Sequence, residues 1–285
     1  MKSIRLSDAL VSDDILIVGL AKGAKADTLK IESGSISLDE KSLLAALKDL
    51  GATGAANEIT KLPGSTTRLL IFTGLGEAKK DYAHEVLRRA AGAASRALAG
   101  EKSAAVALPT NSIERVAAVA EGMTLGAYAF DEFRGSSKAE RKAPLTGATV
   151  HTKMANSAEA KAAVKRAVVI GEYTKLIRDL INTPPSHLTP ESFSRQFAAA
   201  VKTLGGSAAH LKVTILNEKQ LRDGGYGGIS GVGQGSANPP RLLHIAYNPP
   251  KAKKKLAFIG KGITFDTGGY ALKPKAGMEA MKSDM

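Results

Sequence analysis

The last part of the chain carries the residues that are best suited to chemistry. Asp266 and Asp284 are carboxylates, the hard oxygen donors that divalent cations prefer. Lys261 and Lys273 lie in the same stretch and would suit an anion such as phosphate. These residue types predict a metal or phosphate site. By spacing alone, a set of surface salt bridges on a loop fits the pattern equally well.

The elements around these residues would have to position them. The apolar run at 256–259 is predicted to be a strand. Lys261 and Asp266 would then leave its carboxyl end, where open α/β sheets bind their ligands. The pair Gly268–Gly269 would let the chain turn without a side chain standing between the carboxylate and its ligand.

The rest of the chain alternates between strand and helix patterns. Short apolar runs bounded by turn residues predict strands at 14–21, 68–73, 104–108, 148–151, 212–216 and 241–247. Helical spacing predicts helices at 43–50, 81–98, from 111 onward, at 157–181 and at 190–203. Ser37 and Asn111 are the predicted caps of the first and third helices. This alternation is typical of an α/β sheet layered by helices.

Two features divide the chain. The polar, charged segment 134–144 is predicted to be an exposed excursion. The long helix after it is predicted to run to residue 181 and is ended by Thr183 and the two prolines that follow. We therefore predict an N-terminal α/β domain at 1–156, a linker helix at 157–182 and a second α/β unit at 183–285.

Composition excludes several classes of protein. The chain has 285 residues and no cysteine, which excludes disulfides, thiolate zinc sites and cysteine nucleophiles. The lack of cysteine suits a reducing cytoplasm. Three acids, Asp8, Asp13 and Asp14, interrupt the basic N-terminus, so we expect no secretory signal. No apolar run approaches the ~20 residues that span a bilayer, so we expect a soluble protein without membrane contact.

The formal net charge of +13 has two interpretations. It could serve a phosphate-rich partner such as DNA, or it could be a solvated basic face. The basic run at 251–255 follows two prolines and is predicted to be a loop tip. Aromatic residues make up 5% of the chain, with no tryptophan, so few side chains could stack on single-stranded bases.

Other sequence motifs fail on spacing. The glycine-rich segment 224–235 lacks the dinucleotide-binding pattern, and we expect its glycines to form tight turns. His84 begins like a zinc-protease helix, but Arg88 stands where the second histidine must be. His244 lies in an apolar run and is expected to be a core residue. No Gly-x-Ser-x-Gly elbow of a serine hydrolase occurs.

The closing stretch resembles the signature of the leucyl aminopeptidase family, the two-metal cytosol aminopeptidases. The matching residues are the whole run KGITFDTGG at 261–269, the Lys-Pro pair at 273–274 and the Met-x-x-Asp-Met run at 281–285. Weaker similarities are RDLINTPPSHLTPESF at 178–193, GVGQGSANPPRLLHIAY at 231–247 and AEGMTLGAYAFDEF at 120–133. The resemblance implies an N-terminal α/β/α domain of macro-like type, followed by the first part of an α/β metallo-aminopeptidase domain.

The resemblance also implies roles for individual residues. Lys261 and Asp284 would ligate one cation, and Asp266 would bridge that cation and a second one. Lys261 would have to be neutral, because an ammonium has no lone pair to donate. Lys273 would stay charged and polarise the peptide carbonyl, and Met281 would line the pocket for the first side chain. The cofactors would be two divalent cations, Mn²⁺ or Zn²⁺.

The implied function is removal of the N-terminal residue, leucine-like by preference, from peptides in intracellular peptide turnover. The family forms hexamers, so a homo-hexamer is expected. The family's Asn-Thr-Asp-Ala-Glu-Gly-Arg segment, which supplies two more acidic ligands and an arginine, is absent here. We therefore expect a chain truncated within the catalytic domain and inactive by itself. The alternatives are a non-catalytic protein or a basic DNA-binding module, since some relatives are thought to bind DNA.

Overall fold

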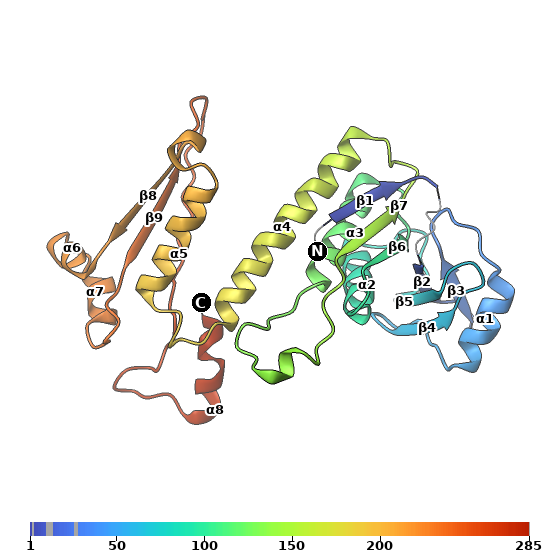
Figure 1. Ribbon diagram of the computed structural model, residues 1–285, viewed down its shortest axis with the longest axis horizontal. Helices are drawn as coiled ribbons and strands as arrows, with labels where there is room; N and C mark the ends of the chain where they lie inside the picture. Colours follow the sequence, from blue (N-terminus) through green and yellow to red (C-terminus); the bar gives the residue numbers. More distant parts are fainter. Residues whose placement is uncertain (2, 10–13, 26–27, 285) are drawn as a thin grey trace. The chain divides into compact units, whose positions relative to one another are not determined.

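The computed structural model describes residues 1, 3–9, 14–25 and 28–284, with the side chains of all of them except Asp284. The chain divides into two compact units, Met1–Ile177 and Arg178–Met285 (Figure 1). The division falls inside the long helix α4 (Ala158–Asn182). The three-part domain division drawn from the sequence stays a prediction. Across the described ranges, no helix is long and apolar enough to cross a membrane.

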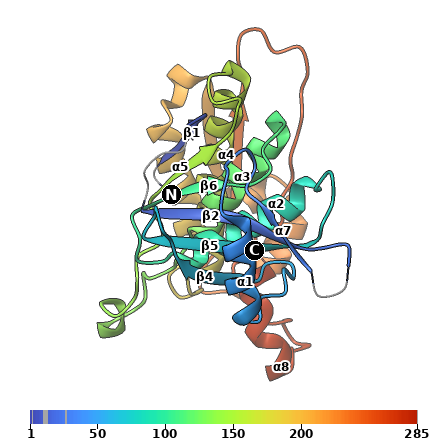
Figure 2. The same ribbon diagram turned by 90° about the vertical axis from the view of Figure 1, so that its right-hand side faces the viewer.

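The first unit is an α/β fold. Its strands are β1 (Ser3–Ser7), β2 (Ile15–Lys22), β3 (Leu29–Glu32), β4 (Ile59–Pro63), β5 (Leu69–Glu77), β6 (Ser103–Ala107) and β7 (Gly147–His151). Its helices are α1 (Glu40–Asp49), α2 (His84–Ala97), α3 (Ile113–Gly126), the short 3-10 turn η1 (Ser136–Lys138) and most of α4. The sheet order is β1-β7-β6-β2-β5-β4, with β3 paired to β2. Figure 2 shows β6, β2, β5 and β4 following one another in this order.

The central strand β2 is buried on both faces. Ile17 lies in a core cluster with Leu87 of α2 and Met123 of α3. Its neighbour Val18 points to the opposite face, into a cluster with Leu47 of α1. All of these side chains are fully buried. A parallel strand covered on both faces must be apolar at every position, so the predicted α/β/α layering is confirmed.

The edges of this sheet were harder to predict than its centre. The four apolar runs predicted here form β2, β5, β6 and β7, with ends shifted by a few residues. The strands β1, β3 and β4 were not predicted, because they are only partly buried and carry polar residues. Helix α1 is capped by Asp39 rather than Ser37, and α3 by Ser112 rather than Asn111. Residues 134–143 are exposed, as predicted for the excursion.

The second unit contains a small antiparallel sheet. Strand β8 (Leu211–Leu216) pairs with β9 (Leu242–Tyr247) along its whole length. Helix α5 (Pro190–Thr203) has the predicted bounds, because Thr189 forms a capping box and a proline follows it. The other elements are η2 (Gly206–Ala209), α6 (Glu218–Asp223), α7 (Gly227–Gly233), α8 (Lys275–Met278) and the 3-10 helix η3 (Glu279–Asp284).

The strand predicted at 256–259 is wrong. Leu256, Phe258 and Ile259 are 80%, 94% and 97% exposed, and the segment has no regular structure. A strand needs a neighbour to satisfy its backbone groups, and no strand in the described part of the chain pairs with this one.

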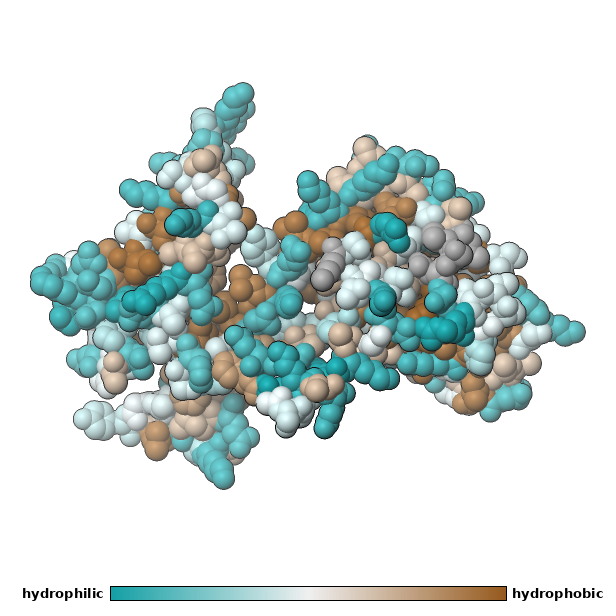
Figure 3. Space-filling model, in the orientation of Figure 1, coloured by the Kyte–Doolittle hydropathy of each residue, from teal (hydrophilic) through white to brown (hydrophobic). Residues whose placement is uncertain are grey.

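His244, predicted to be a core residue, is exposed on β9. Figure 3 shows apolar surface around β8 and β9 as well.

The glycine-rich segment is only partly composed of turns. Gly225 has a φ of 75°, which a tight turn there requires. Residues 227–233, however, form the short helix α7 instead of turns. Because glycine is a poor helix former, the sequence favoured turns over this helix.

Candidate active site

A tight loop presents the first acidic residue of the signature. The backbone N–H of Gly268 donates to Asp266 Oδ1 at 2.9 Å, and the N–H of Lys273 donates to the Thr267 carbonyl at 3.0 Å. Gly268 has a φ of 87°, and a Cβ at this position would collide with the Ala271 carbonyl oxygen. The expectation that this glycine lets the chain turn beside the carboxylate is therefore confirmed.

Three residues of the predicted site converge on this loop. Lys273 Nζ donates to Asp266 Oδ2 at 2.8 Å and to the Met281 sulfur at 2.8 Å. The side chains of Lys273 and Asp266 are 31% and 34% exposed, so the pair is half-buried. The hydrogen bond from Lys273, followed by that from the Gly268 N–H, lowers the pKa of the Asp266 carboxyl. Asp266 is therefore held as an anion at neutral pH.

The other two predicted ligands lie on either side of this cluster in sequence. Lys261 lies in the exposed segment before the loop, and its charge contributes a little to the lowered pKa of Asp266. Asp284 is the last residue of η3, and its side chain lies outside what the structure describes. The ligand roles of Lys261, Asp266 and Asp284 therefore stay predictions.

Sequence reasoning missed one residue beside the site. Lys282, on η3 next to Met281, donates from Nζ to the backbone carbonyl of Leu180 at 3.0 Å. Leu180 lies near the end of α4 and is buried. Burial lowers the pKa of Lys282. The contact joins residues that are 102 positions apart.

The donor atoms of this site are of the kind that binds divalent cations, but the described residues supply too few of them. Asp266 offers a carboxylate, whose Oδ1 accepts from the Gly268 N–H and whose Oδ2 accepts from Lys273 Nζ. A Cβ on Gly269 would meet no atom within 4 Å, so space is open beside the backbone of this glycine. Among the residues that the structure describes, no group of three histidines or acids could hold a metal ion. The described donors could therefore form only part of a coordination shell.

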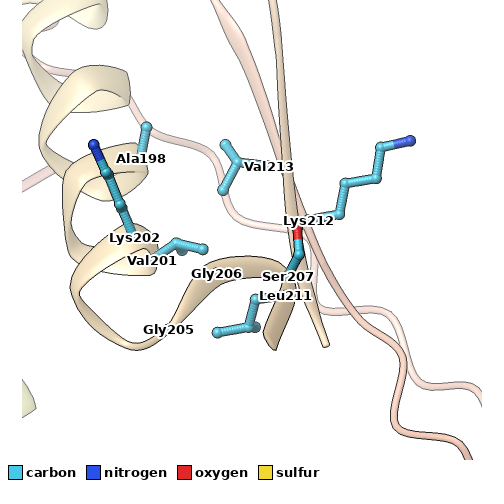
Figure 4. Close-up of a pocket in the computed structure, with 9 residues that line it drawn as sticks. All are labelled: Ala198, Val201, Lys202, Gly205, Gly206, Ser207, Leu211, Lys212 and Val213. Carbon is cyan, nitrogen blue, oxygen red and sulfur yellow. The ribbon is translucent and has the colours of Figure 1, made fainter. Parts of the chain in front are cut away.

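A hollow elsewhere in the second unit has no comparable chemistry. It measures about 480 Å³ and lies between α5, η2 and β8 (Figure 4). Its lining residues are Ala198, Val201, Lys202, Gly205, Gly206, Ser207, Leu211, Lys212 and Val213. No acid or histidine is among them, and the Lys212 side chain extends away from the hollow in Figure 4. The candidate site therefore remains the loop around Asp266.

Two family models together match most of the chain. Residues 15–137 match the description "Cytosol aminopeptidase family, N-terminal domain", and residues 175–285 match "Cytosol aminopeptidase family, catalytic domain". A probable cytosol aminopeptidase of Streptomyces avermitilis is 45% identical, over 100% of this chain and 58% of the relative. The chain thus spans little more than half the length of such relatives.

Two solved structures resemble the fold. The bottromycin maturation enzyme BotP in complex with Mn has a TM-score of 0.71 and 28% identity, over 95% of this chain and 52% of that one. A mutant of tomato leucine aminopeptidase has a TM-score of 0.80, over 100% of this chain and 57% of that one. At 23% identity, the tomato structure supports the fold alone.

Proposed function

The chain belongs to the cytosol aminopeptidase family, and from that premise we propose that it acts in a metal-dependent aminopeptidase. This enzyme removes the N-terminal residue of peptides, with a preference for leucine-like residues, in intracellular peptide turnover. The observation that carries the proposal is the convergence of Asp266, Lys273 and Met281. These three residues of the signature meet at distances of 2.8 Å from Lys273 Nζ.

In this proposal Lys261, Asp266 and Asp284 would hold two divalent cations. When bound, the cations supply an activated water and fix the amino group of the substrate. Mn²⁺ and Zn²⁺ both suit such donors. The complex of BotP with Mn supports Mn²⁺.

Lys273 is the residue that acts on the peptide bond. Its ammonium donates to Asp266 and Met281 in the structure. For catalysis it turns from Asp266 to the carbonyl oxygen of the peptide bond and donates to the negative charge that develops there. Met281 lies within reach of the same ammonium and provides apolar surface for the first side chain of the peptide.

Hydrolysis of leucine p-nitroanilide by the product of the complete reading frame tests the proposal. Added Mn²⁺ should support turnover, and Lys273→Ala should lower kcat by roughly 10²- to 10³-fold, the cost of losing one oxyanion donor. The metal content of Lys273→Ala should stay intact. The matched control is Lys275→Ala, at an exposed lysine two positions away. Absence of metal-dependent turnover would refute the function, and equal losses in both variants would refute the role of Lys273.

The 285-residue polypeptide should behave differently when it is assayed alone. In this proposal Asp266 and Asp284 are the acidic ligands, and two carboxylates cannot offset the charge of two dications. We therefore expect no turnover of leucine p-nitroanilide by this polypeptide, even with added Mn²⁺ or Zn²⁺.

The resemblance supports two further proposals, a homo-hexamer and a cytoplasmic location. Light scattering of the purified protein tests the first, and fractionation of the cells tests the second. The alternative of a basic DNA-binding module is not favoured by the relatives, which are named as aminopeptidases. This alternative can be tested by neutralising lysines in the exposed basic run at 251–255 and measuring DNA binding.

A further inference from the structure

The carbonyl of Leu180, in the last turn of α4, needs a hydrogen-bond donor from outside the helix. In a helix, the carbonyl of Leu180 would accept from the backbone N–H four residues later. That residue is Pro184, which has no N–H. The preceding carbonyl, that of Asp179, does accept the N–H of Thr183 at 2.9 Å. Leu180 is buried, and a buried carbonyl needs a donor from elsewhere.

Lys282 supplies that donor from the other end of the second unit. Its Nζ lies 3.0 Å from the Leu180 carbonyl oxygen. A cation at this position also complements the negative end of the α4 dipole. Lys282 is carried by η3, in which the preceding residue, Met281, accepts from Lys273 Nζ at 2.8 Å. Two successive residues of η3 therefore attach it to two different elements, α4 and the Asp266 loop.

We propose that Lys282 is a positioning residue of the active site, which anchors η3 to α4 so that Met281 stays beside the Asp266 loop and the 3-10 helix that carries Asp284 keeps its place. This inference rests on the proposed function. Lys282 is not a catalytic residue, because its ammonium binds a backbone carbonyl of α4. A 3-10 helix of six residues has little stability of its own. The place of η3 therefore depends on such anchors.

Substitution of Lys282 tests the proposal in the product of the complete reading frame. Lys282→Met keeps the aliphatic part of the side chain but removes the donor and the charge. It should lower kcat on leucine p-nitroanilide by about ten- to hundredfold, because reacting groups tolerate little displacement. It should also weaken Mn²⁺ binding by about tenfold, as is typical when the support of a ligand is lost. Lys282→Arg keeps a long cationic donor and should recover most of both properties.

A second variant separates positioning from simple helix capping. Pro184→Ala returns an N–H four residues after Leu180, which can satisfy the same carbonyl. Combined with Lys282→Met, it should restore the melting temperature but not kcat or Mn²⁺ affinity, because the new N–H cannot hold η3. The double variant also keeps the test decisive if Lys282→Met alone fails to fold.

Two outcomes would overturn the proposal. One is wild-type kcat and Mn²⁺ affinity in Lys282→Met, and the other is recovery of kcat and Mn²⁺ affinity in the double variant. Lys254→Met, at an exposed lysine, is the matched control and should behave as the wild type does. If the wild-type protein lacks leucyl activity, the proposed function fails. The Mn²⁺ affinities then still decide whether Lys282 positions η3.

Discussion

Removal of Lys273 and removal of Lys261 should change the Mn²⁺ affinity of the protein in opposite directions. Lys273 Nζ lies 2.8 Å from Asp266 Oδ2. A divalent cation on the same oxygen would lie about 2.1 Å from it, and therefore no more than about 5 Å from the ammonium. If Asp266 binds a cation as proposed, Lys273 would compete with it for this carboxylate. Lys261 is instead a proposed ligand, so its loss should weaken binding.

The size of the Lys273 effect follows from this geometry. Repulsion between a dication and an ammonium about 5 Å apart would weaken binding by roughly tenfold in the dielectric of water. Lys273 can also turn away from the cation. The loss of Mn²⁺ affinity that Lys273 causes therefore cannot exceed the free energy of its pairing with Asp266. For a pair as exposed as this one, at 31% and 34%, that contribution is a factor of up to about five. We expect Lys273→Met to tighten Mn²⁺ binding by about two- to fivefold, and Lys261→Met to weaken it by at least about tenfold.

Electron paramagnetic resonance of free Mn²⁺ measures both effects, in the product of the complete reading frame after its metal has been stripped. The gain in Lys273→Met should fade at about 0.5 M salt, because an ion pair this exposed is screened. Lys275→Met serves as the charge-matched control at an exposed lysine. Weaker binding in both variants would refute the competition between Lys273 and the metal, as would a gain that salt does not reduce.

Three further predictions concern pH, charge and proteolysis. Because the pKa of Asp266 is lowered in the fold, its pairing with Lys273 should stabilise the loop at neutral pH and be lost only below about pH 4. A carboxyl titration by NMR should therefore give a midpoint below the usual value, which Lys273→Met returns toward normal; an unchanged midpoint would contradict the pairing. If the charge of +13 serves DNA, the affinity for duplex DNA should fall steeply as the salt concentration rises. Neutralising lysines 253–255 should then make this dependence on salt less steep. No binding to DNA near physiological salt would favour a solvated basic face instead. Limited proteolysis of the 285-residue polypeptide should spare residues 1–160 and cut the C-terminal part, and a resistant, monodisperse polypeptide would argue against this.

The fold could be predicted where a segment's own residues determine its structure. Strand β2 is apolar at nearly every position because it is covered on both faces, and α5 carries its start signal at Thr189. The segment 256–259 has the same apolar character, yet it forms no strand. Pairing of a strand depends on a neighbour, and periodicity within the segment carries no information about that neighbour. The partly polar edge strands β1 and β4 were missed for a related reason.

The candidate site could be predicted in its residue types but not in its contacts. The signature indicated Asp266, Lys273 and Met281, and the structure brings these three together. The resemblance assigned Lys273 to the substrate carbonyl, whereas the alternative of salt bridges on a loop is the interpretation that matches its pairing with Asp266. Lys282 was missed although its signal is present in the sequence. Pro184 removes a helical donor, but the sequence cannot tell which distant side chain replaces it.

The completeness of the first unit's sheet affects how the chain folds during synthesis. The sheet is complete once β7 lies between β1 and β6, and all of its strands belong to the unit Met1–Ile177. Ribosomes release the N-terminal part first, and domains generally fold as units while synthesis continues. The first unit can therefore be folded before β8 and β9 exist. The apolar run at 256–259 emerges later with no partner strand among the described elements, so chaperone binding during synthesis should concentrate on that segment.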